Sequence, residues 1–283
     1  MSEFKAVFSE PKSNQDFFLF LKNVYHLYPE DKFHALIQET SARLDTDEAI
    51  YKSVMADLPG IKPFLSELTY ALPSLREQKA EMTRETLDLL EGRSKEYNGY
   101  VEIGSTGRYI SKLRKSLSFS GPIFLINDVE PTYSPPDLAE RGQIPKIGEF
   151  LDISDYAPIP SDKIPDGSID MVTCYIGLHH CKSDKLEDFV RSIARILRPG
   201  GVFVMRDHDV RGPEMHTFVS LVHTVFNLGL QVDWEVEAQD TKLFKSAEEW
   251  AAYICALGFT DSGKRILQDG DPSLNTLMAF SKN

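Results

Sequence analysis

The sequence predicts an α/β protein with a doubly wound, mostly parallel sheet behind an N-terminal helical region. Three observations lead to this prediction. Residues 1–98 show apolar side chains at helical spacing, short apolar runs alternate with longer segments from residue 100 onward, and polar side chains follow several of these runs. Alternation of this kind is typical of sheets covered by helices on both faces. We therefore predict two domains, over residues 1–98 and 99–283.

The first domain is predicted to be helical because apolar residues such as Phe17, Leu21 and Val24 recur at steps of three and four. Helices are expected over residues 14–28, 30–44, 47–58 and 75–90. The expected boundary signals are a Ser13-x-x-Asp16 pattern at the first start, and Pro59-Gly60 and Gly92 at the last two ends. The sequence leaves three roles open for this region: a lid over a ligand, a homodimer interface or a supporting layer.

The second domain contains six strand candidates, with the sequences YVEIG, IFLIND, EFLDI, IDMVTCY, GVFVMRD and TLMAFS. Ligands of doubly wound sheets bind at the carboxyl ends of the strands, so the loops that follow these runs are the expected site. A helix after Gly212-Pro213, with Met215, Phe218 and Leu221, either packs in the core or lines an acceptor pocket. Ser246 and Glu249 predict a capping box for another helix that ends near Gly258.

A glycine turn follows the first strand candidate, in the sequence Glu102-Ile103-Gly104-Ser105-Thr106-Gly107. Glycines let the backbone approach a ligand closely, although such turns also serve as plain connections between strand and helix. The G-x-G-x-x-G fingerprint of dinucleotide-binding proteins is missing. A carboxylate at this position would repel a pyrophosphate and suit a cationic amine, so NAD is disfavoured.

Acidic residues also follow the second and third strand candidates. Asp128, with Val129 behind it, is placed to accept hydrogen bonds from both hydroxyls of a ribose. Asp152 can accept from the exocyclic amine of an adenine, while Ile153 offers an apolar surface to the ring. Solvated loop acids are the alternative interpretation of both carboxylates.

The stretch PDGSIDMVTCYIGLHH, followed by LEDFVRSIARILRPGGVFVMRD, resembles the core of class I S-adenosylmethionine-dependent methyltransferases. The resemblance covers roughly residues 99–283 and implies a seven-stranded Rossmann-like fold, S-adenosylmethionine as cofactor and S-adenosylhomocysteine as product. By matched position it implies these cofactor-binding residues: Glu102, Gly104, Ser105, Thr106 and Gly107 at the methionine part, Asp128 and Val129 at the ribose, Asp152 and Ile153 at the adenine, and the backbone of Cys174 or Tyr175 at the amino group. The family's glycine loop reads G-x-G-x-G, and this chain has Thr106 and Arg108 at its second and third glycines.

Methyl transfer requires a base only when the acceptor must lose a proton. The candidates after the fourth and fifth strands are His179, His180, Asp207 and His208, because imidazole exchanges its proton near neutral pH. Histidines that merely pack beside the cofactor are the alternative. Cysteines and carboxylates nearby also allow a metal site, but their spacing does not require one, so no metal is predicted.

Composition limits the partners. The net charge is −12, which disfavours an extended nucleic-acid interface, and no run of about 18 apolar residues predicts a membrane span. Three cysteines without a C-x-x-C pair suggest a reducing, cytoplasmic location. A small-molecule acceptor is expected. The alternatives are a protein or RNA methyltransferase, and a methyltransferase-like binding module without catalysis. An enzyme that uses NAD or a nucleotide sugar would need a phosphate-binding loop, which the sequence does not contain.

Overall fold

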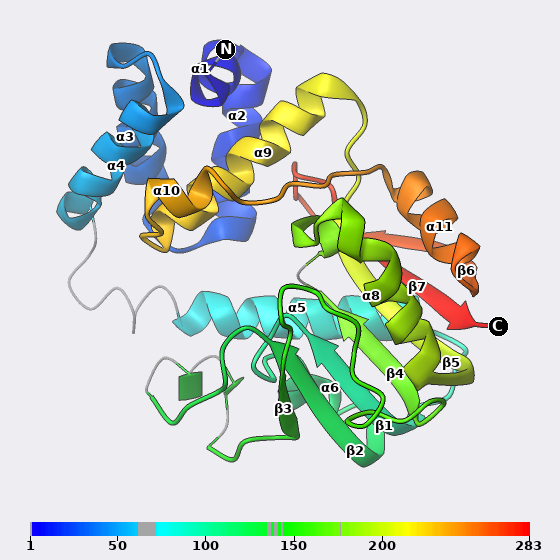
Figure 1. Cartoon of the computed structure of the whole chain (residues 1–283). Coiled ribbons are helices and arrows are strands. Elements are labelled where there is room, and N and C mark those ends of the chain that lie inside the picture. The colour runs from blue at the N-terminus through cyan, green and yellow to red at the C-terminus, as the bar shows by residue number, and fades with distance from the viewer. Residues whose placement is uncertain (1, 62–71, 135–136, 139–140, 143, 176) are drawn as a thin grey trace. The chain divides into compact units, whose positions relative to one another are not determined.

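The computed structural model describes residues 2–61, 72–134, 137–138, 141–142, 144–175 and 177–283. The chain forms two compact units, and each is assembled from separate stretches (Figure 1). The helical unit comprises Met1–Ser74, His208–Phe244 and Gln268–Leu274. The sheet unit comprises Leu75–Asp207, Lys245–Leu267 and Asn275–Asn283.

The helical unit is built around one apolar core. Its helices are α1 (Glu3–Ser9), α2 (Pro11–Phe20), the π-helix η1 (Leu21–Tyr25), α3 (Glu30–Arg43), α4 (Asp47–Ile61), α9 (Gly212–Gly229) and α10 (Trp234–Glu237). Phe17 of α2, Ile37 of α3 and Val54 of α4 are fully buried, and they share this core with Leu221 and Val225 of α9. The interpretation of α9 as an amphipathic core helix is thereby confirmed.

Three predicted helix boundaries in this unit are wrong. The first predicted helix ends at Tyr25 rather than at residue 28, because His26 takes a left-handed conformation with φ 48°. The expected helix start at Ser13 lies inside α2, which begins at Pro11 because the Glu10 carboxylate accepts from the backbone N–H groups of Lys12 and Ser13. Helix α4 does not end before Pro59 but continues to Ile61. Pro59 and Gly60 are exposed near the end of α4, where Pro59 has no N–H to donate to the carbonyl of Met55, so the helix lacks one hydrogen bond there.

The units differ from the predicted division at residue 98 in three places, one of which is the short segment Gln268–Leu274 of the helical unit. Helix α5 (Leu72–Leu89) lies mostly in the sheet unit, where Met82 and Leu89 pack in the core beneath the sheet. Helix α9, from the second half of the sequence, belongs to the helical unit because its apolar side chains complete the core of that unit.

The sheet has seven strands in the order β3-β2-β1-β4-β5-β7-β6. They are β1 (Glu96–Ile103), β2 (Ser118–Asn127), β3 (Glu149–Asp152), β4 (Ile169–Cys174), β5 (Leu197–His208), β6 (Phe259–Leu267) and β7 (Asn275–Lys282). Strands β3, β2, β1, β4 and β5 pair in parallel, whereas β6 and β7 are antiparallel. The order of the chain reverses between β1 and β4, which is where a doubly wound sheet binds its ligand.

Three strands, β1, β2 and β5, begin earlier than predicted because glycines with positive φ carry them through an irregularity; in β2 this glycine is Gly121, at φ +70°. In β1 the register shifts at Gly99, which has φ +88° and where a Cβ would lie 2.8 Å from the carbonyl oxygen of Ser168. In β5 the Pro199-Gly200-Gly201 turn is part of the strand, with Gly200 at φ +78°. Asp170 joins the amino ends of β1 and β5: it accepts from the backbone N–H of Asn98 at 2.6 Å and from Arg198 at 2.5 Å.

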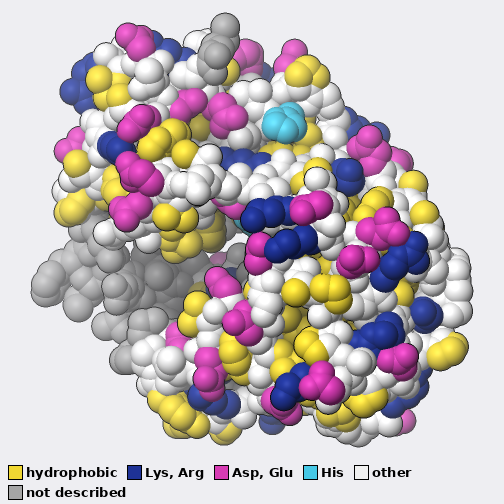
Figure 2. Space-filling model, in the orientation of Figure 1, with side chains coloured by type: hydrophobic (Ala, Val, Ile, Leu, Met, Phe, Trp, Pro, Cys, Tyr) yellow, Lys and Arg dark blue, Asp and Glu magenta, His cyan; other side chains and the backbone are white. Residues whose placement is uncertain are grey.

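The other helices of the sheet unit are short or cover the sheet. They are α6 (Ile110–Leu113), the 3-10 helix η3 (Leu178–His180), α8 (Ser183–Ile196) and α11 (Ala247–Ala256). The capping box of Ser246 and Glu249 is present at the start of α11. Among the described residues, none of the helices combines the length and the apolar character needed to cross a bilayer. Figure 2 shows acidic and basic side chains intermingled over the visible face.

Candidate active site

Backbone hydrogen bonds join the carboxyl ends of β1, β2 and β3. The N–H of Gly104 donates to the carbonyl oxygen of Ile126 at 2.8 Å, and the N–H of Ile153 donates to that of Asn127 at 3.0 Å. Strand β4 ends beside β1, with Cys174 level with Ile103. The turns after these four strands therefore lie together along one edge of the sheet.

Glu102 is fully buried beneath the glycine turn. Its carboxylate accepts from the backbone N–H groups of Tyr109 at 3.1 Å and Ile110 at 2.8 Å, and from the hydroxyls of Tyr100 at 3.0 Å and Ser105. Burial raises the pKa of Glu102, and the hydrogen bonds oppose that rise. The Glu102 carboxylate thus holds the turn and the start of α6 in place. Because it is not exposed, it is not placed to make the expected contact with a cationic amine.

Ser105 and Thr106 lie at the tip of the same turn. The Ser105 hydroxyl accepts from the N–H groups of Gly107 at 3.2 Å and Arg108 at 3.1 Å, which closes the turn. The Thr106 side chain is 7% exposed, and its hydroxyl has no hydrogen-bond partner within the described part of the chain. A buried hydroxyl without a partner is costly, so this atom fits a ligand that would hydrogen-bond to it.

The acids after β2 and β3 face solvent, as a ligand site requires. Asp128 and Val129 are exposed, and Val129 retains 59% of its accessible surface. Asp152 is also exposed and accepts from the N–H of Ser154 at 2.6 Å, while Ile153 is half-buried. These side chains are free to meet a ribose and an adenine; the assignment of each group stays a prediction.

Cys174 and Tyr175, after β4, have buried side chains. The Tyr175 hydroxyl lies 2.9 Å from Oγ1 of Thr86, and its ring contacts that of Tyr109 with 4.6 Å between centroids. Because the side chains are buried, only their backbone groups could make the predicted contact with a ligand, and that contact stays a prediction.

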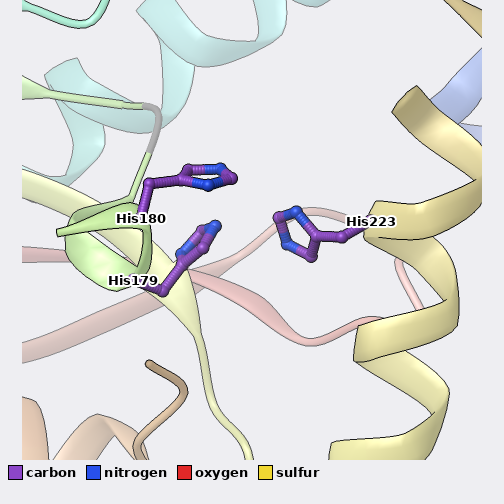
Figure 3. A group of neighbouring side chains, drawn as sticks. All are labelled: His179, His180 and His223. Atoms are coloured by element: carbon purple, nitrogen blue, oxygen red, sulfur yellow. The ribbon is translucent and has the colours of Figure 1, made fainter. Parts of the chain in front are cut away.

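His179 and Asp207 form a buried pair that links η3 to the end of β5. Nδ1 of His179 lies 2.9 Å from Oδ1 of Asp207, and the backbone N–H of His179 donates to Oδ2 at 3.3 Å. An ionised carboxylate can only accept, so Nδ1 is the donor and the ring's lone pair is on Nε2. His180 is half-buried, and its ring lies beside that of His179, with centroids 4.3 Å apart (Figure 3).

His208 belongs to the helical unit, unlike the other catalytic candidates. Its Nδ1 donates to the carbonyl oxygen of Ser273 at 2.8 Å, and its Nε2 lies 3.1 Å from Nε2 of His223 on α9. Both nitrogens of His208 are thus engaged within that unit. This arrangement favours a structural role for His208, and the sequence carried no signal for its partner His223.

Sequence reasoning missed Gly177, which makes room for the pair of His179 and Asp207. A Cβ at Gly177 would lie 2.2 Å from Nδ1 of His179 and 2.6 Å from Oδ2 of Asp207. No side chain larger than hydrogen fits there without displacing the pair. The sequence does not indicate this role of Gly177, because no local pattern shows which loop residue faces the side chain of a histidine two positions later.

The order and direction of the strands define the fold class of the sheet unit. The sheet unit has the Rossmann-like fold of class I S-adenosylmethionine-dependent methyltransferases. Residues 143–205, which extend from the segment before β3 into β5, match the family model described as "Methyltransferase domain". This match agrees, over the matched segment, with the resemblance inferred from the sequence.

Three solved structures illustrate the likeness of fold. An O-methyltransferase family 2 protein from Planctomyces limnophilus, in complex with apigenin, has a TM-score of 0.52 and 14% identity over 82% of this chain and 66% of that chain. The CurJ carbon methyltransferase has a TM-score of 0.51 and 15% identity over 96% of this chain and 70% of that chain. A Haloferax volcanii protein in complex with the Trm112 methyltransferase activator has a TM-score of 0.50 and 15% identity, over 75% and 92%. No curated protein matches the chain in sequence.

Proposed function

We propose that this protein is an S-adenosylmethionine-dependent methyltransferase that acts on a small-molecule acceptor. The observation that carries the proposal is the juxtaposition of the glycine turn with the exposed carboxylates of Asp128 and Asp152 along one sheet edge. The Thr106 hydroxyl supports it, since its hydrogen bond is left for a ligand to make. The apigenin complex of the similar O-methyltransferase supports an acceptor of small size.

In this proposal the residues of the turn bind the methionine part, Asp128 accepts from the ribose hydroxyls, and Asp152 with Ile153 receives the adenine. Bound S-adenosylmethionine would supply a methyl group already activated by the sulfonium charge. The protein's main contribution is then to position the acceptor in line with that methyl group and to exclude water. Glu102 contributes indirectly by holding the turn in place.

His179 is the residue we assign to proton removal from the acceptor. Its Nε2 would take the proton from an acceptor hydroxyl or amine, and the Asp207 carboxylate would hold the ring through Nδ1 and balance the charge of the imidazolium. His180, beside it, would line the acceptor side. An acceptor that loses no proton would need neither histidine for chemistry.

The partners and location stay part of the proposal. The net charge of −12 and the intermingled charges of Figure 2 argue against an extended nucleic-acid substrate. Cys174, Cys181 and Cys255 are unbridged, in keeping with a reducing cytoplasm. A homodimer, and a role of residues 1–98 as a lid, stay predictions from the sequence.

Calorimetric titration with S-adenosylmethionine and S-adenosylhomocysteine, with NADH and ATP as controls, tests the proposal. We expect micromolar binding of the adenosyl ligands alone. Asp128→Ala should weaken this binding by roughly 10- to 100-fold, because a charged hydrogen bond contributes about 1.5–3 kcal/mol. The matched control Asp184→Ala removes an exposed acid from the first turn of α8 and should leave affinity unchanged.

The outcome also separates the alternatives. If neither adenosyl ligand binds, the proposed function is wrong, and a binding module whose glycine loop has closed becomes the better account. If they bind but no S-adenosylhomocysteine forms with mixtures of small molecules, the acceptor is instead a protein or RNA, or catalysis has been lost.

A further inference from the structure

The helical unit contains a hollow at the start of α9. It has a volume of about 440 Å³ and is lined by Val210, Gly212, Pro213, His216, Thr217 and Phe244. All six residues belong to the helical unit, so the hollow is a feature of that unit by itself. Its volume falls within the range of sites that hold small organic molecules.

Flat rings form one wall of the hollow. The rings of His216 and Phe244 lie nearly perpendicular, at 76°, with 5.4 Å between centroids. The Phe244 ring also contacts His223 at 5.3 Å and the edge of His208 at 6.0 Å. Because His208 and His223 are themselves joined at 3.1 Å, the Phe244 ring is held in a fixed orientation.

Polar groups lie beside this wall. The imidazole of His216 is exposed at the rim. The Thr217 hydroxyl donates to the carbonyl oxygen of Pro213 at 3.0 Å, which leaves its lone pairs to accept a hydrogen bond. Gly212, at φ +81°, leaves open space where a Cβ would project. A ligand here would meet apolar surface, two aromatic rings and the polar atoms of His216 and Thr217.

We propose that this hollow binds a small planar aromatic molecule that carries one hydroxyl or amine. Aromatic rings prefer offset or edge-to-face contact with one another, and the perpendicular pair of His216 and Phe244 offers both to a flat ligand. The hydroxyl or amine of the ligand would hydrogen-bond to His216 or Thr217. The proposal concerns binding in the helical unit and does not rest on methyl transfer.

The test compares two probes of similar size, 2-naphthol and its saturated analogue decahydro-2-naphthol, on the full chain without cofactor. NMR titration follows affinity and the resonances of His216. We expect 2-naphthol to bind about three- to tenfold more tightly and to shift the His216 signals, because only the aromatic probe gains ring contacts.

Two variants and one control locate the binding. Phe244→Leu keeps an apolar side chain but removes the ring, and should lower 2-naphthol affinity about three- to tenfold. His216→Ala changes an exposed residue, so folding is not at risk, and should lower it by a similar factor. Phe226→Leu makes the same change as the first variant at a position on α9 that is 42% exposed and outside the hollow, and should have no effect.

The proposal is overturned if 2-naphthol does not bind, if both probes bind equally, or if His216→Ala and a folded Phe244→Leu both retain full affinity. Circular dichroism and the melting temperature establish whether each variant is folded. Failure here leaves the binding of adenosyl ligands untouched, since no cofactor is used.

Discussion

Replacing Gly177 by alanine tests whether this glycine holds the pair of His179 and Asp207 together. The new Cβ would lie 2.2 Å from Nδ1 of His179, whereas ordinary contact begins at 3.4 Å. The His179 ring is the flexible partner in this clash, so it should retreat by about 1 Å. Its Nδ1 lies 2.9 Å from Asp207, and the separation would grow to roughly 4 Å, beyond hydrogen-bond distance.

The expected cost follows from the loss of that hydrogen bond. A buried hydrogen bond to a charged group contributes about 1.5–3 kcal/mol, so the free energy of unfolding should fall by this amount. For a chain of this size the melting temperature should fall by roughly 3–10 °C. The catalytic effect should be larger than the loss of stability suggests, because a base displaced by 1 Å costs on the order of 100-fold in rate.

Calorimetry gives the melting temperature, and NMR of labelled histidines follows the Nδ1–H of His179, which should exchange slowly in the native protein. His179→Gln assigns that resonance. Gly60→Ala on α4 is the matched control, because a Cβ there meets nothing within 4 Å, and alanine should stabilise the helix by about 0.5–1 kcal/mol. If Gly177→Ala keeps both the protected resonance and the melting temperature, the glycine does not position the pair.

Three other perturbations have defined outcomes. Glu102→Gln should be less stable than the native protein because an acceptor for the backbone N–H groups is lost. Since burial raises the native pKa of Glu102, the free energy of unfolding of the native protein falls as pH rises above 4.5. The difference in stability between the two proteins, measured by urea unfolding, should therefore shrink from pH 5 to pH 8, and a constant difference would contradict the raised pKa. Burial raises the pKa of Cys181 to about 12, so about one Cys181 side chain in ten thousand is a thiolate at pH 8. Iodoacetamide should therefore react first with the half-buried Cys255, and mass spectrometry of the labelled protein measures this order. Lys242→Met should lower the free energy of unfolding, measured by chemical denaturation, by about 3 kcal/mol, because it leaves the buried carboxylate of Glu237, 2.7 Å from Lys242, without its cation. An unchanged midpoint would show that hydrogen bonds from Thr224 and Asn227 are enough to stabilise this carboxylate.

The centre of the parallel part of the sheet could be predicted because β1, β4 and β5 are largely buried on both faces and read as apolar runs. Strand β6 could not be predicted, since it is an antiparallel strand at the sheet edge, most of its side chains are half-buried or exposed, and Gly263 at φ +75° interrupts its pattern. The sequence also did not show that α9 belongs to the helical unit. A helix that is apolar on one side shows that it packs in a core but does not show which core.

For the site, the acids after β2 and β3 were predictable because parallel strands end at one edge. The pairing of His179 with Asp207 was not, since it depends on the register that sets Cys174 of β4 level with Met205 of β5. The burial of Glu102 was missed for a related reason. Its partners Tyr109 and Ile110 reach it only once the turn has folded back, and sequence spacing does not report that return.

The interleaved helical unit has a consequence for how the chain is made. The chain passes between the two units five times, and α1 to α4 leave the ribosome well before α9 exists. At a synthesis rate of about 5–20 residues per second, the apolar faces of α1 to α4 would stay uncovered for on the order of ten seconds before α9 is made. During synthesis this stretch is therefore a natural client for chaperones, and a fragment that ends before Gly212 should aggregate rather than fold as an independent piece.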